Sequence, residues 1–281
     1  MSVAAILGAG PVGGAIALRL AERQRIAEIR LIDEQAQVAA GKALDIQQSG
    51  PIAGFDTRLS ATGDVLAAAG ADVIVVADDL TYGEWQGDRG LALVARLHRA
   101  GARAPIVFAG PSQTWLMETA ARELHIEADR LIGTAASATP AIVSSLVAID
   151  LEKTGAQVAI SGRPPSFVVV WSSATIGGAL ITDRLPAHRL LAISQTLSRL
   201  WPPGPQAIAA PTAQVVDALL TGSRSLLSVC VITGDEFDAR GRSALLPVSL
   251  GHGRVLARHL PTLSPQERTE TVTSLARQDR S

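Results

Sequence analysis

Apolar and polar positions follow two different periods along the first half of the chain. Short runs of consecutive apolar residues, typical of strands buried on both faces, occur at residues 4–10, 28–34, 71–77 and 104–110. Apolar residues recur at helical spacing at 13–25 and at 90–101, where Gly101 supplies a common helix stop. Strands that alternate with helices predict an α/β fold, a doubly wound parallel sheet with helices on both faces.

The second half has a different order of elements. Strand-like runs at 156–162 and 166–181 follow each other directly, and helical spacing occurs at 186–201 and 211–220. Two further antiparallel strands are predicted at 225–234 and 244–256. Ser264 and Glu267 flank Pro265 as a capping box, which predicts that a last helix begins there. We therefore predict an α/β domain at residues 1–134 and an α+β domain at 135–281.

Composition narrows the classes of function. The 281 residues are 47% hydrophobic, enough for a large core, and 25 basic against 26 acidic residues leave a formal charge of −1 with no block of either sign. This argues against a nucleic-acid partner or an anionic membrane surface. Cys230, the only cysteine, lies in an apolar run and is interpreted as a core residue. No histidines show metal-ligand spacing and no basic leader or membrane span is visible, so we expect a cytoplasmic protein without a metal site.

A glycine pattern follows the first predicted strand and opens the first predicted helix. Gly8 allows a tight turn, Gly10 lets the backbone approach a pyrophosphate, and Gly13 lets the helix pack closely on the strand. Asp33 lies 20 residues after Gly13, where a carboxylate accepts from ribose hydroxyls and disfavours a 2′-phosphate. The pattern predicts a dinucleotide site that prefers NAD over NADP. The alternative is a glycine-rich turn that binds no ligand.

Longer segments resemble the lactate/malate dehydrogenase family, and most of all its malate dehydrogenases. The resemblance begins in the stretch at residues 41–79 and continues in order over nearly the whole chain. Its segments are "VFAGPS" (107–112), "RLIGTA" (130–135), "SSATIGG" (172–178), "AIAAPTAQVVDALL" (207–220) and "LLPVSLGHGRV" (245–255). It implies an N-terminal NAD-binding Rossmann domain, an α+β substrate domain, and a homo-dimer or tetramer. The cofactor-contacting residues it implies are Gly8, Gly10, Pro11, Val12, Gly13, Asp33 and Ala77.

The family's catalytic residues do not carry over to this chain. In the family, a histidine paired with an aspartate exchanges the hydroxyl proton, arginines bind the substrate carboxylate and polarise the carbonyl, and an asparagine follows the fifth strand. The resemblance places Pro164 at the histidine, Thr139 at the aspartate, Ile142 at one arginine, Tyr82 and Asp88 at the two loop arginines, and Gly110 at the asparagine. Since acid–base help alone contributes about 10²- to 10⁴-fold, malate or lactate turnover should be very poor.

Two acidic residues also bear on the cofactor. Asp78 and Asp79 end the strand at 71–77, where the family has small residues beside the dinucleotide. A carboxylate about 6 Å from a phosphate costs roughly 3 kcal/mol at an effective dielectric of 20, which weakens NAD about a hundredfold. The penalty disappears if these side chains point into solvent.

Three hypotheses follow. The leading one is a non-catalytic, NAD(H)-binding or regulatory member of the family. The second is a working NAD-dependent dehydrogenase for a less anionic substrate, in which Tyr82, Arg89 or Arg163 has a new role and His252, in a glycine-flanked loop, is a minor candidate. The third is a structural partner that binds no nucleotide and works through its surface.

Overall fold

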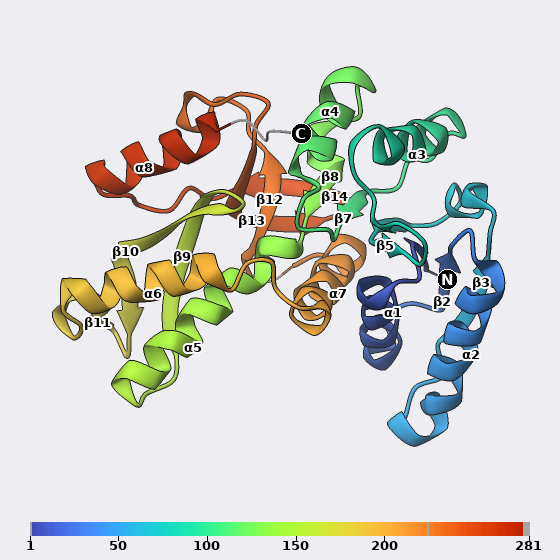
Figure 1. The fold of residues 1–281 in the computed structure, drawn as a ribbon, viewed down its shortest axis with the longest axis horizontal. Helices are drawn as coiled ribbons and strands as arrows, with labels where there is room; N and C mark the ends of the chain where they lie inside the picture. Colours follow the sequence, from blue (N-terminus) through green and yellow to red (C-terminus); the bar gives the residue numbers. More distant parts are fainter. Residues whose placement is uncertain (1, 224, 278–281) are drawn as a thin grey trace.

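The computed structural model describes residues 2–223 and 225–277, and its centre is a single nine-stranded sheet (Figure 1). Six strands are parallel and stand in the order β3-β2-β1-β4-β7-β8. Their bounds are β1 Val3–Leu7, β2 Glu28–Ile32, β3 Arg58–Thr62, β4 Val73–Val76, β7 Ile106–Phe108 and β8 Leu131–Gly133. This is the doubly wound order of the Rossmann fold, so the predicted fold class is confirmed.

Three antiparallel strands from the second half extend the same sheet beyond β8. They are β12 (Leu227–Ile232), β13 (Ser243–Gly251) and β14 (Arg254–Arg258). The strand predicted at 244–256 is therefore a hairpin, because His252 and Gly253 both have positive φ and turn the chain. The domain boundary after residue 134 stays a prediction, since hydrogen bonds cross it within one sheet.

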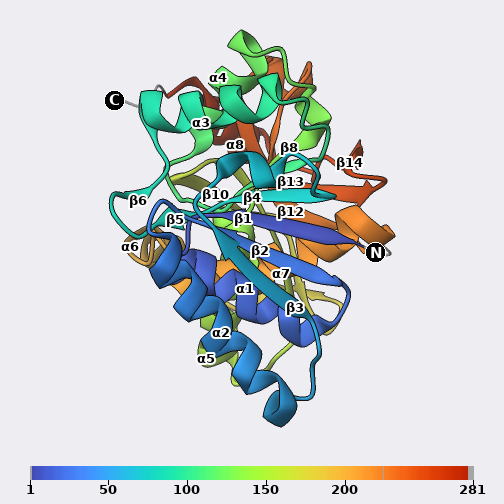
Figure 2. The same cartoon turned by 90° about the vertical axis from the view of Figure 1, so that its right-hand side faces the viewer.

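Helices cover both faces of this sheet, as Figure 2 shows. The helices on one face are α1 (Pro11–Arg23), α2 (Ala36–Ala53) and α7 (Pro205–Thr221), and those on the other are α3 (Gly87–Arg99) and α4 (Thr114–Glu123). Ala4 and Ile6 of β1 face the first layer, and Ala5 and Leu7 face the second. Since successive side chains of a strand alternate between faces, consecutive apolar residues are what a strand buried on both sides requires.

A second layer packs against the far end of the large sheet. It is a three-stranded sheet of β9 (Ala156–Arg163), β10 (Ser166–Ile176) and β11 (Ala179–Leu180), flanked by α5 (Thr139–Leu151), α6 (Ala187–Arg199) and α8 (Pro265–Ala276). Ser264 and Glu267 form the predicted capping box of α8. Helix α7 begins at Pro205, six residues before the segment 211–220 in which helical spacing was predicted. In the described parts of the chain, no helix is long and apolar enough to cross a bilayer.

Candidate functional site

The glycine loop, residues 8–14, lies where the strand order of the sheet reverses. It follows β1, whose neighbours are β2 on one side and β4 on the other. Gly8 has a φ of +108°, and Gly10 is the N-terminal cap of α1, with Pro11 at its first position. In open α/β sheets this crevice at the carboxyl ends of the strands is where nucleotides bind. The path of the loop is therefore that of a dinucleotide-binding turn.

Asp78 occupies the mouth of this loop. It follows β4, in the two-residue strand β5 (Asp78–Asp79), and its carboxylate accepts from the N–H groups of Val12 and Gly13 at 3.1 and 2.8 Å. A Cβ added to Gly10 would lie 2.5 Å from the Asp78 carboxylate. The start of a helix attracts negative charge, and here an internal side chain supplies it. Asp78 points into the site rather than into solvent.

Asp33 is directed toward the backbone. It is 3% exposed, and its carboxylate accepts from the N–H groups of Ala9 at 2.9 Å, Leu80 at 3.0 Å and Gln35 at 3.0 Å. These bonds fix the turn after β2 against the glycine loop. These three backbone donors use most of the acceptor capacity of Asp33, and its contact with a ribose stays a prediction.

Asp79 organises the segment that carries Tyr82 and Asp88. Its carboxylate accepts from the N–H groups of Thr81 and Tyr82 and forms an ion pair with Arg89. Burial acts to raise the pKa of Asp79, but the Tyr82 amide and the Arg89 guanidinium outweigh it and hold that pKa below its usual value. Arg89 also stacks on the rings of Tyr82 and Trp85. Tyr82 and Asp88 are both exposed, the latter in the first turn of α3.

Glu84 fills the space beside Gly110. It belongs to β6 (Gly83–Glu84), accepts from the Ser112 N–H at 2.7 Å, and lies where any side chain at position 110 would stand. Burial raises the pKa of Glu84 above its usual value despite that hydrogen bond. The sequence analysis did not identify Glu84, although it lies between the singled-out Tyr82 and Asp88. Glu84 fills this space through a contact with Gly110, which lies 26 residues further along the chain, so no local sequence pattern indicates it.

Gly110 and Pro164 come together in an apolar pocket. Its lining residues are Phe108, Gly110, Pro111, Gln113, Thr114, Met117, Gly133, Ala135, Ala136, Pro164, Trp201 and Cys230. No lining residue is charged, and the pocket volume of about 10 Å³ has room for one water at most. Burial raises the pKa of the Cys230 thiol to about 12, so it is a neutral core group. The pocket lining therefore has no carboxylate, imidazole, ammonium or guanidinium group.

Thr139 and Ile142, which the resemblance places at the family's aspartate and one of its arginines, are both packed against this chain's own residues. Thr139 is 1% exposed, and its hydroxyl donates to the carbonyl of Ala136 at 2.7 Å. Ile142 is partly buried against the apolar core beneath α5. Neither side chain can supply the carboxylate or the guanidinium that the family has there.

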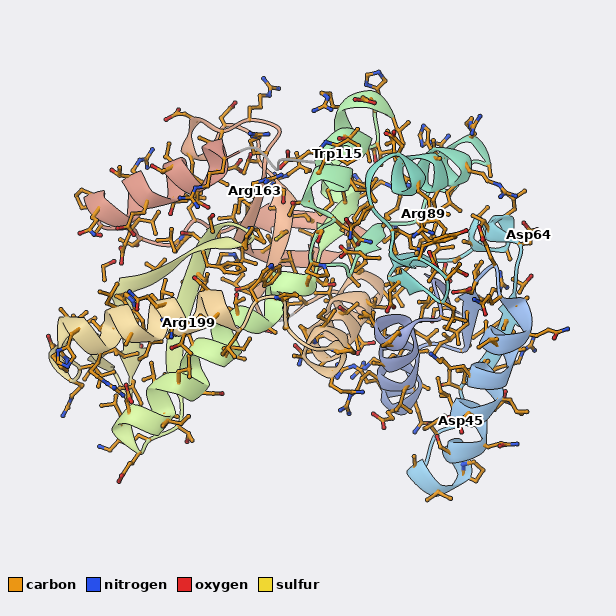
Figure 3. The ribbon with its side chains drawn as sticks, in the orientation of Figure 1. Asp45, Asp64, Arg89, Trp115, Arg163 and Arg199 are labelled. Atoms are coloured by element: carbon orange, nitrogen blue, oxygen red, sulfur yellow. The ribbon has the colours of Figure 1, made fainter. Side chains whose placement is uncertain are left out.

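Arg163 lies in a buried charge cluster at the end of β9. It is 3% exposed and donates to Glu118 at 2.9 Å, and Arg242 and the Ser243 N–H bond to the same carboxylate. Arg163 ends β9 and Arg89 lies in the first turn of α3, and Figure 3 shows these two arginines, proposed for a rebuilt site, in different parts of the molecule. Arg163 pairs with Glu118 and Arg89 pairs with Asp79. Buried charges are stable only when paired in this way.

His252 is remote from the glycine loop. It is exposed in the β13–β14 turn, and the adjacent Gly253 approaches Pro105, which precedes β7. The turn therefore lies at the amino ends of the parallel strands, opposite the site. Within residues 2–223 and 225–277, no three His, Cys, Asp or Glu side chains converge in a way that could hold a metal ion.

Comparison with known proteins gives the same family as the sequence segments. Residues 2–82 match the sequence model of the lactate/malate dehydrogenase NAD-binding domain. The chain is 28% identical, over 98% of its length and 97% of the relative, to malate dehydrogenase of Thioalkalivibrio sulfidiphilus. It is 25% identical to malate dehydrogenase of Chlorobium luteolum, over 88% and 86% of the two chains.

Solved structures show the same fold. Malate dehydrogenase from Salinibacter ruber superposes with a TM-score of 0.85 at 22% identity, covering 97% of this chain and 93% of the other. Minor L-lactate dehydrogenase from Enterococcus mundtii gives 0.85 at 19% identity, covering 97% and 95%.

These matches confirm NAD as the cofactor of the predicted N-terminal domain. The Asp78 carboxylate accepts from the two amides at the start of α1, which is where a helix N-terminus would hold a phosphate. The family-model match to residues 2–82, the malate dehydrogenase relatives over most of the chain and the shared fold together support the lactate/malate dehydrogenase family.

Proposed function

We propose that this protein binds NAD(H) without turning over malate or lactate, and acts as a binding or regulatory member of its family. The observation that carries the proposal is the apolar pocket at Gly110 and Pro164, which contains no charged lining residue. Hydride transfer to a 2-oxo acid needs a proton donor and a cation for the carboxylate. Loss of the acid–base group alone removes about 10²- to 10⁴-fold in rate.

The test assays the oxidation of malate and lactate by NAD and the reverse reductions by NADH, each followed by NADH absorbance, in the same preparation that is titrated with NADH. We expect NADH binding by calorimetry and nicotinamide fluorescence, and no turnover above the uncatalysed background. A turnover number near the enzyme median of about 10 s⁻¹ would contradict the proposal. Absence of binding at millimolar NADH would instead favour the surface-partner hypothesis.

A second candidate function is a dehydrogenase with a rebuilt site. Glu84 favours it, because a half-buried carboxyl with a raised pKa beside Gly110 has the environment of a general acid. Tyr82 is a second candidate, because its phenol could also carry a proton. If a substrate screen finds an activity, Tyr82→Phe keeps the ring under Arg89 and removes only the hydroxyl. Unchanged activity in that variant would exclude Tyr82 from the mechanism.

The remaining expectations also belong to this proposal. They are a cytoplasmic location, a homo-dimer or tetramer, and a boundary between two domains after residue 134. Light scattering on the purified protein tests the oligomeric state directly. A monomeric mass would overturn that part of the proposal and leave the binding function intact.

A further inference from the structure

Every backbone N–H of the glycine loop already has a partner inside the protein. Gly8 donates to the Ile32 carbonyl at 2.7 Å, Gly10 to the Asp78 carbonyl at 2.8 Å, and Gly14 to the Gly10 carbonyl at 2.9 Å. Ala9 donates to Asp33, and Val12 and Gly13 donate to the Asp78 carboxylate. Pro11 has no N–H. The loop therefore has no free amide with which to bind a diphosphate.

Asp78 holds the two amides at the start of α1, which are the ones a diphosphate approaches. Its carboxylate also lies where the missing side chain of Gly10 leaves room. Backbone approach of a ligand normally explains a glycine at that position. In this chain the absent side chain of Gly10 makes room for Asp78.

We propose that Asp78 is an internal competitor for the diphosphate and thereby the residue that sets which ligands the site accepts. This inference rests on the proposed NAD(H)-binding function. A ligand with a diphosphate binds only when the Asp78 side chain leaves the loop, because two anions cannot share the same donors. A nucleoside without phosphate does not compete with it. Asp78 therefore lowers affinity for dinucleotides selectively.

Lys42 binds the carbonyl groups of the glycine loop, whereas Asp78 binds its amides. Its ammonium donates to the carbonyls of Ala9 at 2.5 Å and Gly10 at 3.2 Å, while Asp78 accepts from the amides. With the Lys42 ammonium and the Asp78 carboxylate both bound to it, the glycine loop keeps its conformation without a ligand. When Asp78 is removed, Lys42 still supports the backbone, so the freed amides keep their direction.

The experiment compares the full chain with Asp78→Ala, Asp78→Asn and the charge-matched control Asp45→Asn, at an exposed position of α2 (Figure 3). Each protein is titrated by calorimetry with adenosine, ADP-ribose and NADH. We expect Asp78→Ala to tighten ADP-ribose and NADH by ten- to a hundredfold, the size of one removed charge repulsion, and to change adenosine less than twofold. Asp78→Asn removes the charge at nearly constant shape and should gain less. Asp45→Asn should match the wild type.

Three results would overturn the inference. They are no gain for ADP-ribose in either Asp78 variant that keeps the wild-type circular dichroism, an equal gain for adenosine, or the same gain in Asp45→Asn. The wild-type titration separately decides the proposed function. If wild type fails to bind NADH and Asp78→Ala binds it, the inference stands and the proposed function fails. If wild type binds NADH and Asp78→Ala binds no better, the reverse holds.

Discussion

The glycine loop and the apolar pocket have diverged in opposite ways. The loop keeps Gly8, Gly10, Gly13 and Asp33, yet internal carboxylates have taken its hydrogen-bond donors. The pocket lies beside β7 and the β9–β10 turn, and none of its lining residues is charged. A retained motif therefore does not by itself leave its amides free for a ligand. The loop shows how a sequence can keep a fingerprint because the fold needs it.

The packing around the glycines supports this conclusion. A side chain at Gly8 would overlap the Asp78 carbonyl, and one at Gly13 would overlap the Gly8 carbonyl. Both close approaches are between backbone segments of this chain and involve no ligand. Selection for folding alone is sufficient to keep these two glycines.

The largest expected effect is that of Gly8→Ala, measured without any nucleotide. Gly8 has a φ of +108° and no room for a Cβ, so the free energy of unfolding should fall by about 3 kcal/mol or more. Gly41→Ala is the matched control, because Gly41 lies within α2 with no neighbouring atoms within 4 Å of its added Cβ and should gain about 0.5–1 kcal/mol. Urea unfolding followed by circular dichroism measures both. Equal stability of Gly8→Ala and wild type would show that the glycine serves only a ligand.

The second-largest effect tests whether Glu84 occupies the space beside Gly110 at the apolar pocket. Gly110→Asn restores the family's residue type but drives a side chain into Glu84, and we expect a loss of about 2 kcal/mol. Glu84→Ala in the same chain should recover at least 1 kcal/mol of it, as a double-mutant cycle in urea would show. Strict additivity of the two substitutions would mean that Glu84 does not fill the space of the lost asparagine.

A smaller effect is expected when Asp78 is removed in the absence of nucleotide. Asp78→Ala leaves the amides of Val12 and Gly13 to water, so the free energy of unfolding should fall by about 1 kcal/mol, as for the loss of a helix cap. Asp45→Asn should change it little. Asp78→Ala is also expected to bind ADP-ribose more tightly, so its stability and its affinity for ADP-ribose change in opposite directions. A stabilised Asp78→Ala protein would contradict the hydrogen bonds described for the loop.

The order of elements around the loop could be predicted from the sequence because it depends on local patterns. Apolar runs fix the parallel strands, and the Ser264 and Glu267 spacing predicts the cap of α8. The predicted strand at 244–256 was wrong in one respect, since the turn at His252 divides it. A histidine adopts positive φ less often than a glycine, so the residue type at 252 gives only a weak indication of a turn.

The contacts that define the site could not be predicted in the same way. The sequence identified Asp78 as a residue beside the cofactor but left open whether it points into the site or into solvent. Its hydrogen bonds to Val12 and Gly13 join positions 66 and 65 residues apart, and Arg163 meets Glu118 across 45 residues. Such pairings depend on the tertiary packing of strands. No local pattern contains them.

The smallest expected effect concerns pH and the Glu84 carboxyl. Burial raises the pKa of Glu84, with the nearby Asp78 charge acting in the same direction. The folded protein therefore keeps this proton at pH values where the unfolded chain has released it. The resulting stabilisation is complete below the pKa of the unfolded chain, near 4.5, and is lost as the pH rises through the pKa of the folded protein. Glu84→Gln cannot titrate, so the difference in unfolding free energy between wild type and variant should shift in favour of the variant as pH rises from about 4.5 to 7. Urea titrations at several pH values measure this difference. A constant difference would place Glu84 in solvent and remove it from the space beside Gly110, leaving that side of the comparison without its occupant.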